Sequence, residues 1–230
     1  MGKLSLLTGN ETKENSQQSI GNTDAVSRFD AILDAAEQVF ASSGYKGATM
    51  REIAEAAQVA QGLIHYHFNN KETLFEKVVA RRSDEINDRR AKLLAALFEQ
   101  NDRPELSDIV DALFRPTIET GLNLARDGGA FARILVSFAN SADLRNQNLA
   151  EKYYDPIARK YIGALMQVEP GLTRANAVWA YMFAIGVGMT MMAKTGRPGR
   201  LSDGECDDGN VDEMLERIVP FICAGIRALV

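Results

Sequence analysis

The stretch that decides the fold is T-M-R-E-I-A-E-A-A-Q-V-A-Q-G-L-I-H-Y-H-F-N-N-K-E-T-L-F, from Thr49 to Phe75. Thr49, with Glu52 three residues later, has the pattern of a capping box, which satisfies free backbone N–H groups at a helix start. We expect a short helix there, a break at residues 58–60 and a second short helix over residues 61–68. Two short helices joined by such a turn form a helix-turn-helix, whose second helix enters the major groove of DNA.

The second helix of this motif is predicted to be two-sided. Ile64 and Phe68 are four residues apart, so both face the inside of the motif together with Val59. The residues left on or near the outer face are Gln61, Gly62, Leu63, His65 and Tyr66. A helix of this kind fits the major groove, which is about 12 Å wide.

The flanking sequence continues in helical periodicity. An apolar stripe before the motif predicts a helix ending near Gly44, and it consists of Phe29, Ile32, Leu33, Ala36, Val39 and Phe40. Residues 1–25 are polar and lack this periodicity, so we expect a disordered arm. A long helix is expected over residues 71–99. Further helices are predicted over 105–126, 130–140, 147–168, 173–194 and 211–229.

These elements predict an all-α chain, because no segment alternates with the period of a strand. Residues 26–72 are expected to form a three-helix DNA-binding domain, and residues 73–230 a larger helical domain. Pro220 predicts a kink in the last helix. The acidic residues of loop 196–210 lack the spacing of a calcium loop, so we interpret them as a solvated surface.

Composition is compatible with a DNA-binding protein of the cytoplasm. The net charge is −5, but residues 28–92 hold ten basic and ten acidic residues, so most of the acidity lies elsewhere. Two cysteines are too few for a disulfide framework. We find no signal peptide, and the most apolar stretch, Val178 to Ala193, is shorter than the roughly 20 residues of a membrane span.

The number and positions of the histidines argue against a catalytic site or a metal site. His65 and His67 are the only two, and positions two apart on a helix point about 200° apart. Nucleophilic catalysis usually needs a histidine base, and both histidines lie in the DNA-reading motif. We therefore predict no catalytic residue, metal or cofactor. An enzyme that uses carboxylates alone remains the enzymatic alternative.

The run from Thr49 to Phe75 resembles the signature of the TetR family of bacterial regulators, T-x-R-x-I-A-x-x-A-G-V-S-x-G-x-(L/I)-(Y/H)-(Y/H)-H-F-x-x-K-E-x-L. The resemblance covers residues 28–76. Gln58 stands where the family has glycine, at a position that often needs a left-handed backbone, which costs about 1 kcal/mol for other residues. Ala60 stands where a serine usually caps the second helix, so about 1 kcal/mol of capping is absent.

The resemblance implies which residues contact DNA. Thr49 caps the first motif helix near a phosphate, and the backbone at Met50 donates to a phosphate oxygen. The base-edge candidates are Gln61, Leu63 and His65, with Gly62 allowing close approach. Tyr66 and His67 are expected to contact the sugar-phosphate backbone, and Lys71 to neutralise a phosphate.

The resemblance also implies a ligand cavity in the second domain. We expect it among the large apolar side chains, which include Phe114, Phe131, Phe138, Tyr154, Trp179 and Phe183. Methionine-rich and aromatic pockets are adaptable and mostly apolar, so the effector is expected to be hydrophobic or amphipathic, an acyl chain or an aromatic compound. The candidates for holding an acidic head group are Arg115, Arg133 and Arg159.

The last two predicted helices are expected to form a homodimer through a four-helix bundle. Ala180, Ala184, Gly186 and Gly188 are small enough to let helices approach closely. The chain is then a repressor that leaves a palindromic operator when its effector binds. The alternatives are an activator, or a DNA-binding regulator without a small ligand.

Overall fold

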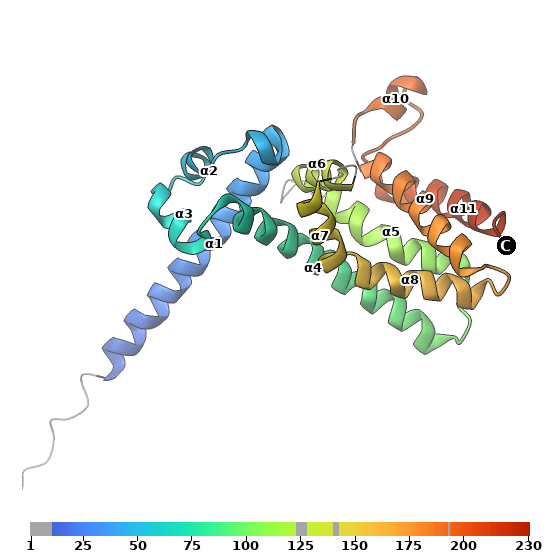
Figure 1. Ribbon diagram of the computed structural model, residues 1–230, viewed down its shortest axis with the longest axis horizontal. Helices are drawn as coiled ribbons and strands as arrows, with labels where there is room; N and C mark the ends of the chain where they lie inside the picture. Colours follow the sequence, from blue (N-terminus) through green and yellow to red (C-terminus); the bar gives the residue numbers. More distant parts are fainter. Residues whose placement is uncertain (1–10, 123–127, 140–142, 193) are drawn as a thin grey trace, which may run out of the picture.

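The computed structural model describes residues 11–122, 128–139, 143–192 and 194–230, and every regular element within these ranges is a helix (Figure 1). In chain order the helices are α1 (Glu11–Gly47), α2 (Met50–Ala56), α3 (Gln61–Phe68), α4 (Lys71–Gln100), α5 (Leu106–Leu122), α6 (Gly128–Ala139), α7 (Leu144–Tyr153), α8 (Asp155–Val168), α9 (Arg174–Met192), α10 (Arg197–Leu201) and α11 (Val211–Arg227).

The predicted disordered arm is only partly compatible with this structure. The backbone of α1 is already helical at Glu11, so residues 11–25 continue the amphipathic helix, while residues 1–10 lie outside the described part. This segment contains no proline, and helical hydrogen bonds are local, so a polar sequence can extend a helix that packing has nucleated further on. The predicted stop at Gly44 is confirmed, because its φ of 65° and ψ of 171° interrupt the helix.

The N-terminal unit consists of α1, α2, α3 and the first turns of α4. Its core contains Ile32, Phe40, Ile53, Ile64 and Phe68, all buried. Ile64 and Phe68 therefore face inward, as their four-residue spacing predicts. The small α2–α3 pair is held against α1, which leaves the opposite side of α3 to solvent.

Helix α4 connects the N-terminal unit to the rest of the molecule (Figure 1). The Asn70 side chain caps it by accepting from the Thr73 N–H at 2.8 Å. Glu37 of α1 is buried and receives two hydrogen bonds of 2.9 Å from Arg82 of α4. Burial alone would lower the pKa of Arg82, but the hydrogen bonds and charge of Glu37 outweigh it and raise the pKa. This buried ion pair joins α1 to α4.

The remaining helices form a bundle in which α5 packs against α4, α8, α9 and α11. The predicted helix over 147–168 is two helices, because the backbone turns at Tyr154 and α8 restarts with Pro156 in its first turn. Proline is favoured there because the first helical N–H groups have no intrahelical partner. Helix α6 packs against α1, so this end of the bundle touches the N-terminal unit.

Loop 196–210 is more ordered than a solvated acidic loop. It contains α10, and Asp208 is buried with its carboxylate accepting from the Gly196 N–H at 2.8 Å. This hydrogen bond from a backbone N–H explains how the carboxylate of Asp208 can be buried, and the composition of the loop does not reveal it.

Helix α9 is the one described helix with the length and apolar character of a membrane span. It packs against α5, α6, α8 and α11. Packing within the helical bundle accounts for the apolar residues on its buried side.

Candidate nucleic-acid interface and effector cavity

The capping box at the start of α2 is present as predicted. The Thr49 N–H donates to Glu52 Oε2 at 2.8 Å, and Thr49 Oγ1 accepts from the Glu52 N–H at 3.1 Å. Thr49 is exposed and Met50 half-buried, so the first turn of α2 lies at the surface. Free N–H groups at such a helix start favour an anion.

The turn between α2 and α3 has the backbone that the family pattern implies. Gln58 has a φ of 54°, in the left-handed region where glycine is favoured. Ala60 is the N-cap of α3 and makes no side-chain cap hydrogen bond. The left-handed backbone at Gln58 is thus adopted by a residue other than glycine, and the start of α3 lacks the side-chain cap that a serine would supply.

Helix α3 presents a polar and aromatic face to solvent. Gln61, Gly62 and His65 are exposed, and the Tyr66 side chain is 80% exposed. A Cβ atom added to Gly62 would meet nothing within 4 Å. Because a large aromatic side chain at this exposure gains nothing from the fold, Tyr66 is a candidate contact residue.

Leu63 and His67 are half-buried and sit at the edge of that face. The His67 ring packs edge-on against Phe29 of α1, with ring centroids 5.8 Å apart. His65 Nδ1 lies 3.0 Å from the Asn69 carbonyl oxygen. The two histidines thus have separate surroundings, as expected for positions two apart on a helix.

Lys71 at the start of α4 is tied to the rest of the N-terminal unit. Its Nζ donates to the Ala48 carbonyl at 2.8 Å and lies 4.7 Å from the centroid of the Tyr45 ring. A role on a DNA phosphate therefore has to coexist with these two contacts, which also hold the chain just before α2.

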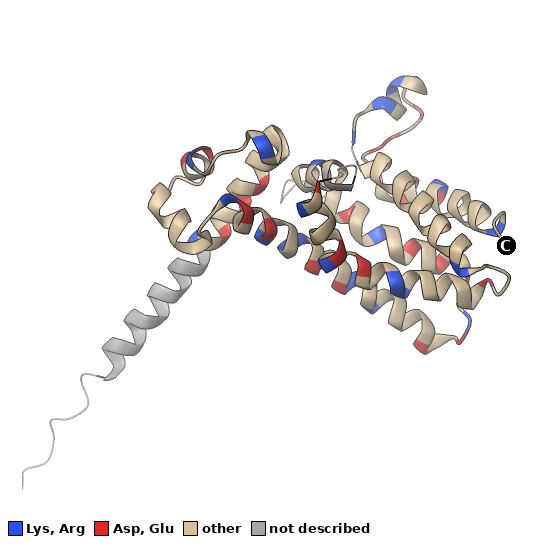
Figure 2. Cartoon of the chain, in the orientation of Figure 1, with Lys and Arg blue, Asp and Glu red and all other residues tan. Residues whose placement is uncertain are grey.

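Helix α3 itself carries no charged residue (Figure 2). The N-terminal unit carries exposed cations on other helices, among them Lys46 at the end of α1 and Arg51 of α2. Arg51 pairs with Glu55 at 2.9 Å, with both side chains largely exposed.

Helix α7 links the bundle to the N-terminal unit. The Arg145 guanidinium stacks 3.4 Å from the centroid of the Tyr45 ring. Lys152 pairs with Glu76 of α4 at 2.6 Å, and this hydrogen bond lowers the pKa of Glu76. Tyr45 is therefore held between Arg145 of the bundle and Lys71 beside the DNA-facing helices.

A cavity of about 210 Å³ lies between α4, α5, α8 and α9. Its apolar lining includes Ile86, Phe114, Leu135, Ile185, Met189 and Met192. Gly188 also lines it, and a Cβ atom there would lie 2.3 Å from Phe114 Cε1. The absence of a side chain at Gly188 is what allows the Phe114 ring to pack on α9.

The polar residues of this cavity converge from three helices and the α7–α8 junction. They are Arg90, Thr117, Tyr154, Asp155 and Tyr181. Burial raises the pKa of Tyr154 to about 12, against the opposing effects of the Ser83 hydroxyl that donates to it and of the Arg90 charge. Burial likewise raises the pKa of Tyr181. Both phenols are therefore neutral at physiological pH.

The structure brings only some of the predicted pocket residues together. Phe114 and Tyr154 line the cavity, whereas Phe131 is buried in the core outside the lining. Phe138 lies in α6, but its side chain is outside the described residues. Trp179 and Phe183 are 59% and 57% exposed, so their placement in the cavity was wrong. Helix α9 is apolar on all sides, and periodicity cannot then distinguish its core side from its solvent side.

The three arginines that were expected to hold an acidic head group of the effector also lie outside this cavity. Arg115 and Arg159 pair with Asp111 and Asp155 one turn away, and Arg133 is exposed. None of them lines the cavity, whereas Arg90, which sequence reasoning missed, does. An arginine in the middle of a long polar helix has no signal in sequence, because its burial depends on which helices cover it.

An apolar stripe faces outward on α9. It follows the i, i+3, i+4, i+7 spacing of one helix face and consists of Trp179, Met182, Phe183 and Gly186, all exposed. On α11 and its C-cap the exposed apolar or small residues are Pro220, Phe221, Ala224, Gly225 and Ala228, while Asp212, Glu216, Arg217 and Arg227 are exposed charged residues. We call the α9 stripe and these apolar or small residues of α11 the outward face.

The small residues predicted for dimer contact mostly point the other way. Ala180, Ala184 and Gly188 are buried within the chain's own bundle, and Gly186 alone of the four is exposed. The close approach that they permit is therefore within one protomer, as the contact of Gly188 with Phe114 illustrates.

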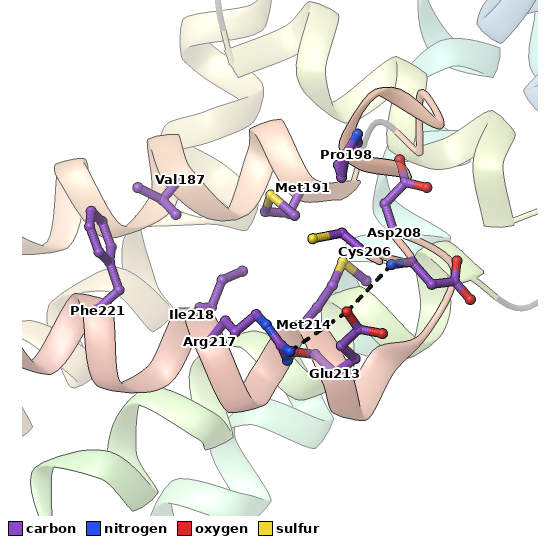
Figure 3. A pocket seen from close by; sticks show the side chains of 11 residues that line it. Val187, Met191, Pro198, Cys206, Asp208, Glu213, Met214, Arg217, Ile218 and Phe221 are labelled. Atoms are coloured by element: carbon purple, nitrogen blue, oxygen red, sulfur yellow. Dashed lines mark hydrogen bonds and ion pairs between the residues drawn. The ribbon is translucent and has the colours of Figure 1, made fainter. Parts of the chain in front are cut away.

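A second hollow, of about 310 Å³, lies between α9 and α11 next to the α10 loop (Figure 3). Met191, Met214 and Ile218 line it, and Phe221 of the outward face borders it. In Figure 3 the side chains of α9 and α11 face one another across this hollow. The hollow adjoins the outward face and is separate from the Arg90 cavity.

Comparisons with known proteins agree with this architecture. Residues 32–78 match a model described as bacterial regulatory proteins, tetR family, and residues 111–225, half of the chain, match a tetracyclin repressor-like C-terminal domain. The HTH-type transcriptional repressor AcnR of Corynebacterium diphtheriae is 41% identical over 56 residues, which cover 24% of this chain and 30% of that protein. The matches to such curated relatives therefore span less than a third of their length.

Two solved structures share the fold over most of the chain. The fatty acid degradation regulator FadR from Bacillus halodurans superposes with a TM-score of 0.64 at 19% identity, covering 87% of this chain and 96% of that one. The transcriptional regulator FadR from Bacillus subtilis, in complex with stearoyl-CoA, has a TM-score of 0.64 at 15% identity, covering 86% and 98%. With both of its halves matched to family models, this chain belongs to the TetR family of bacterial regulators.

Proposed function

We propose that this protein is a dimeric transcriptional repressor that binds operator DNA through α3 and is released by a small hydrophobic or amphipathic effector. The observation that carries the proposal is the solvent-facing side of α3. It combines an open glycine at Gly62, an 80% exposed Tyr66 and the exposed amide of Gln61. Uncharged polar side chains read base edges, while helix N-termini and nearby lysines bind phosphates.

The roles of the individual contacts follow from their exposure. Gln61 and His65 are exposed towards base edges, and Leu63 reaches them from the rim of the face. Gln61 Nε2 lies 3.4 Å from His65 Nε2 and His65 Nδ1 3.0 Å from the Asn69 carbonyl oxygen, so contacts with bases replace or share these interactions. Tyr66 and His67 contact the sugar-phosphate backbone. Thr49, Met50 and Lys71 bind phosphates on either side. Lys71 does so while its Nζ remains close to the Ala48 carbonyl.

The outward face of α9 and α11 supports a homodimer. Met182 is 54% and Phe221 66% exposed, and they lie on two helices that pack against each other. Exposed large apolar side chains of this kind mark protein interfaces. A second copy, packed through the same face about a two-fold axis, covers it symmetrically. Two copies of α3 then address two half-sites about 34–36 Å apart, so the operator is a palindrome.

The Arg90 cavity is the proposed effector site. It lies between helices and combines an apolar lining with a few converging polar groups, as small-molecule sites do. The hollow beside α10 is less suitable, because it is more open to solvent than the Arg90 cavity. The FadR relative from Bacillus subtilis, which binds stearoyl-CoA, supports an amphipathic effector in this fold.

Two connections link this cavity to the DNA-facing helices. Helix α4 carries Arg90 in the cavity wall and Lys71 beside α3. Helix α7 carries Ala150 in the wall and Arg145 stacked on Tyr45. An effector that favours another arrangement of α4 and α7 changes the distance between the two recognition helices, which lowers operator affinity by a population shift.

The test is a selection of bound sequences from fragments of the source genome, followed by binding measurements at fixed salt. We expect a palindromic site, and we expect Tyr66→Ala to weaken binding roughly tenfold or more, about 1.4 kcal/mol. Leu201→Ala is the matched control, because Leu201 is an exposed apolar residue in α10, away from α3. No palindrome from the selection, or equal affinity of Tyr66→Ala and the control, would contradict the proposal.

Such a repressor acts in the cytoplasm, where the operator is, and needs no catalytic residue, metal or cofactor. A reporter gene behind the selected operator distinguishes repression from activation. Repression requires expression to rise when the gene for this protein is deleted.

A further inference from the structure

We propose that the effector of this site is a small apolar carboxylic acid whose carboxylate is held by Arg90. The inference rests on the proposed effector site and names its ligand class. It starts from the surroundings of Arg90, which is 5% exposed in α4 and lines the cavity.

Arg90 is held by neutral acceptors only. Its Nε donates to the Leu113 carbonyl at 2.9 Å, its Nη2 to Thr117 Oγ1 at 2.6 Å and its Nη1 to Asn87 Oδ1 at 3.3 Å. Within the part of the chain that the structure describes, no carboxylate lies within ion-pair distance of it. A guanidinium has five N–H groups, so these three bonds leave two for a ligand.

Another arginine of the same helix shows how a buried guanidinium is usually compensated. Arg82, two turns before Arg90, makes a two-bond ion pair with the buried carboxylate of Glu37. Removing a charge from water costs free energy unless a counter-charge is supplied. Among the described residues Arg90 has no such partner, and the space beside it is a cavity, so a bound anion supplies the missing charge.

Asp155 is the acid among the residues that line the cavity, and it does not pair with Arg90. It forms its ion pair with Arg159, one turn further along α8, at 3.3 Å. Tyr154 and Tyr181 are neutral phenols, since burial raises the pKa of each. A carboxylate suits Arg90 because the planar guanidinium donates two parallel hydrogen bonds to its two oxygens.

The rest of the cavity sets the size and polarity of the ligand. Beyond Arg90 the wall is formed by Phe114, Ile185, Met189 and Met192. A volume of about 210 Å³ equals the liquid volume of roughly seven water molecules. This space matches a medium-length acyl chain or a single aromatic ring, and the flexible methionines adapt to either.

The experiment compares acids with alcohols of the same carbon skeleton, on the full chain and without DNA. Octanoate is paired with octanol, and phenylacetate with phenylethanol, with affinity measured by calorimetry and thermal shift. We expect at least one acid to bind roughly tenfold tighter than its alcohol, because the alcohol cannot form the charge-assisted pair. Equal affinity within both pairs, or no binding of either acid, overturns the proposal.

Arg90→Gln tests the anchor directly. We expect it to lower the affinity for the acid roughly tenfold, to the level of the alcohol, and to leave alcohol binding unchanged. Arg103→Gln is the matched control, because Arg103 donates to the Val168 carbonyl at 2.9 Å and does not line the cavity. A preference for the acid that survives Arg90→Gln, or that Arg103→Gln also removes, contradicts the assignment.

A second variant covers the case in which Arg90→Gln does not fold. Ala158 lines the cavity and is half-buried, so Ala158→Phe fills the apolar part and leaves Arg90 in place. We expect it to abolish acid binding, and retained binding would place the acid elsewhere. The acid-binding measurements contain no DNA, so the two proposals can fail separately. A lack of acid binding rejects the carboxylic-acid effector and leaves operator binding untouched. Failure of the operator selection rejects the DNA-binding proposal, and the preference for the acid can still be measured.

Discussion

Gly62 is the residue at which DNA binding can be tested with least disturbance of the fold. It is exposed in α3, and an added Cβ atom would meet nothing within 4 Å. Replacing a helical glycine with leucine stabilises a helix by up to about 1 kcal/mol. We expect Gly62→Leu to raise the free energy of unfolding and to lower operator affinity roughly tenfold, because the new side chain separates α3 from the DNA.

Gly163 provides the control for that substitution. It is also an exposed helical glycine with open space around it, but it lies in α8. Gly163→Leu should stabilise the protein similarly and leave operator affinity unchanged. Urea unfolding and fluorescence anisotropy measure the two quantities, and equal operator affinities for the two variants would exclude close approach of DNA at Gly62.

The turn before α3 is expected to gain stability from the family's usual residues. Gln58 has a φ of 54°, so Gln58→Gly relieves left-handed strain of about 1–2 kcal/mol, offset in part by the extra chain entropy of glycine. Ala60→Ser adds the missing cap of α3, worth about 1 kcal/mol. Urea denaturation measures both effects, and a loss of stability in either single variant would contradict this account of the turn.

Tyr154 makes the stability of the protein sensitive to alkaline pH. A tyrosine is neutral when protonated, and burial raises the pKa of Tyr154 from 10.0 to about 12. The folded state thus holds the proton more tightly, so this stabilisation is complete below pH 10 and is lost as the pH rises through 12. We expect Tyr154→Phe to lose less stability between these values than the original chain. Parallel curves of unfolding free energy against pH would contradict this.

At the scale of helices, the pair of Glu37 with Arg82 is the main polar link between α1 and α4. Glu37 is 1% exposed, so Glu37→Ala removes the buried carboxylate that accepts two hydrogen bonds from the Arg82 guanidinium. We expect a loss of about 3–5 kcal/mol in the free energy of unfolding. Glu55→Ala breaks the exposed pair with Arg51 and should have a far smaller effect on the free energy of unfolding, because solvent screens this pair. Denaturation curves with similar shifts for the two variants would show that burial does not strengthen the α1–α4 link.

At the scale of the molecule, the outward face predicts the assembly. We expect the chain to sediment at micromolar concentration with twice its mass of 25.3 kDa. Phe183→Glu brings two like charges together at the two-fold axis and should shift the protein towards monomer. Leu144→Glu adds the same charge at a 70% exposed residue of α7 and should leave the dimer intact. A monomeric original chain, or a dimeric Phe183→Glu, would reject this interface.

Local rules were sufficient for most of the DNA-reading unit. The capping box of Thr49 with Glu52 and the inward pair Ile64 and Phe68 follow from residues within about one turn of each other, whereas the left-handed backbone at Gln58 was expected only from the family resemblance. The capping box and the inward pair form from short-range geometry, so the amino-acid order alone specifies them. The start of the first helix did not follow from such local rules. Residues 11–25 lack apolar periodicity and yet continue α1.

What only the tertiary structure decided is which side of each apolar helix faces the core. Helix α9 is apolar around its whole circumference, so its sequence is equally consistent with Trp179 lining a cavity and with Trp179 facing a second copy. Likewise Arg90 stands in a polar helix and becomes buried only because α5 and α9 cover it. Burial results from contacts between helices distant in the chain, and these contacts determine both the cavity and the outward face.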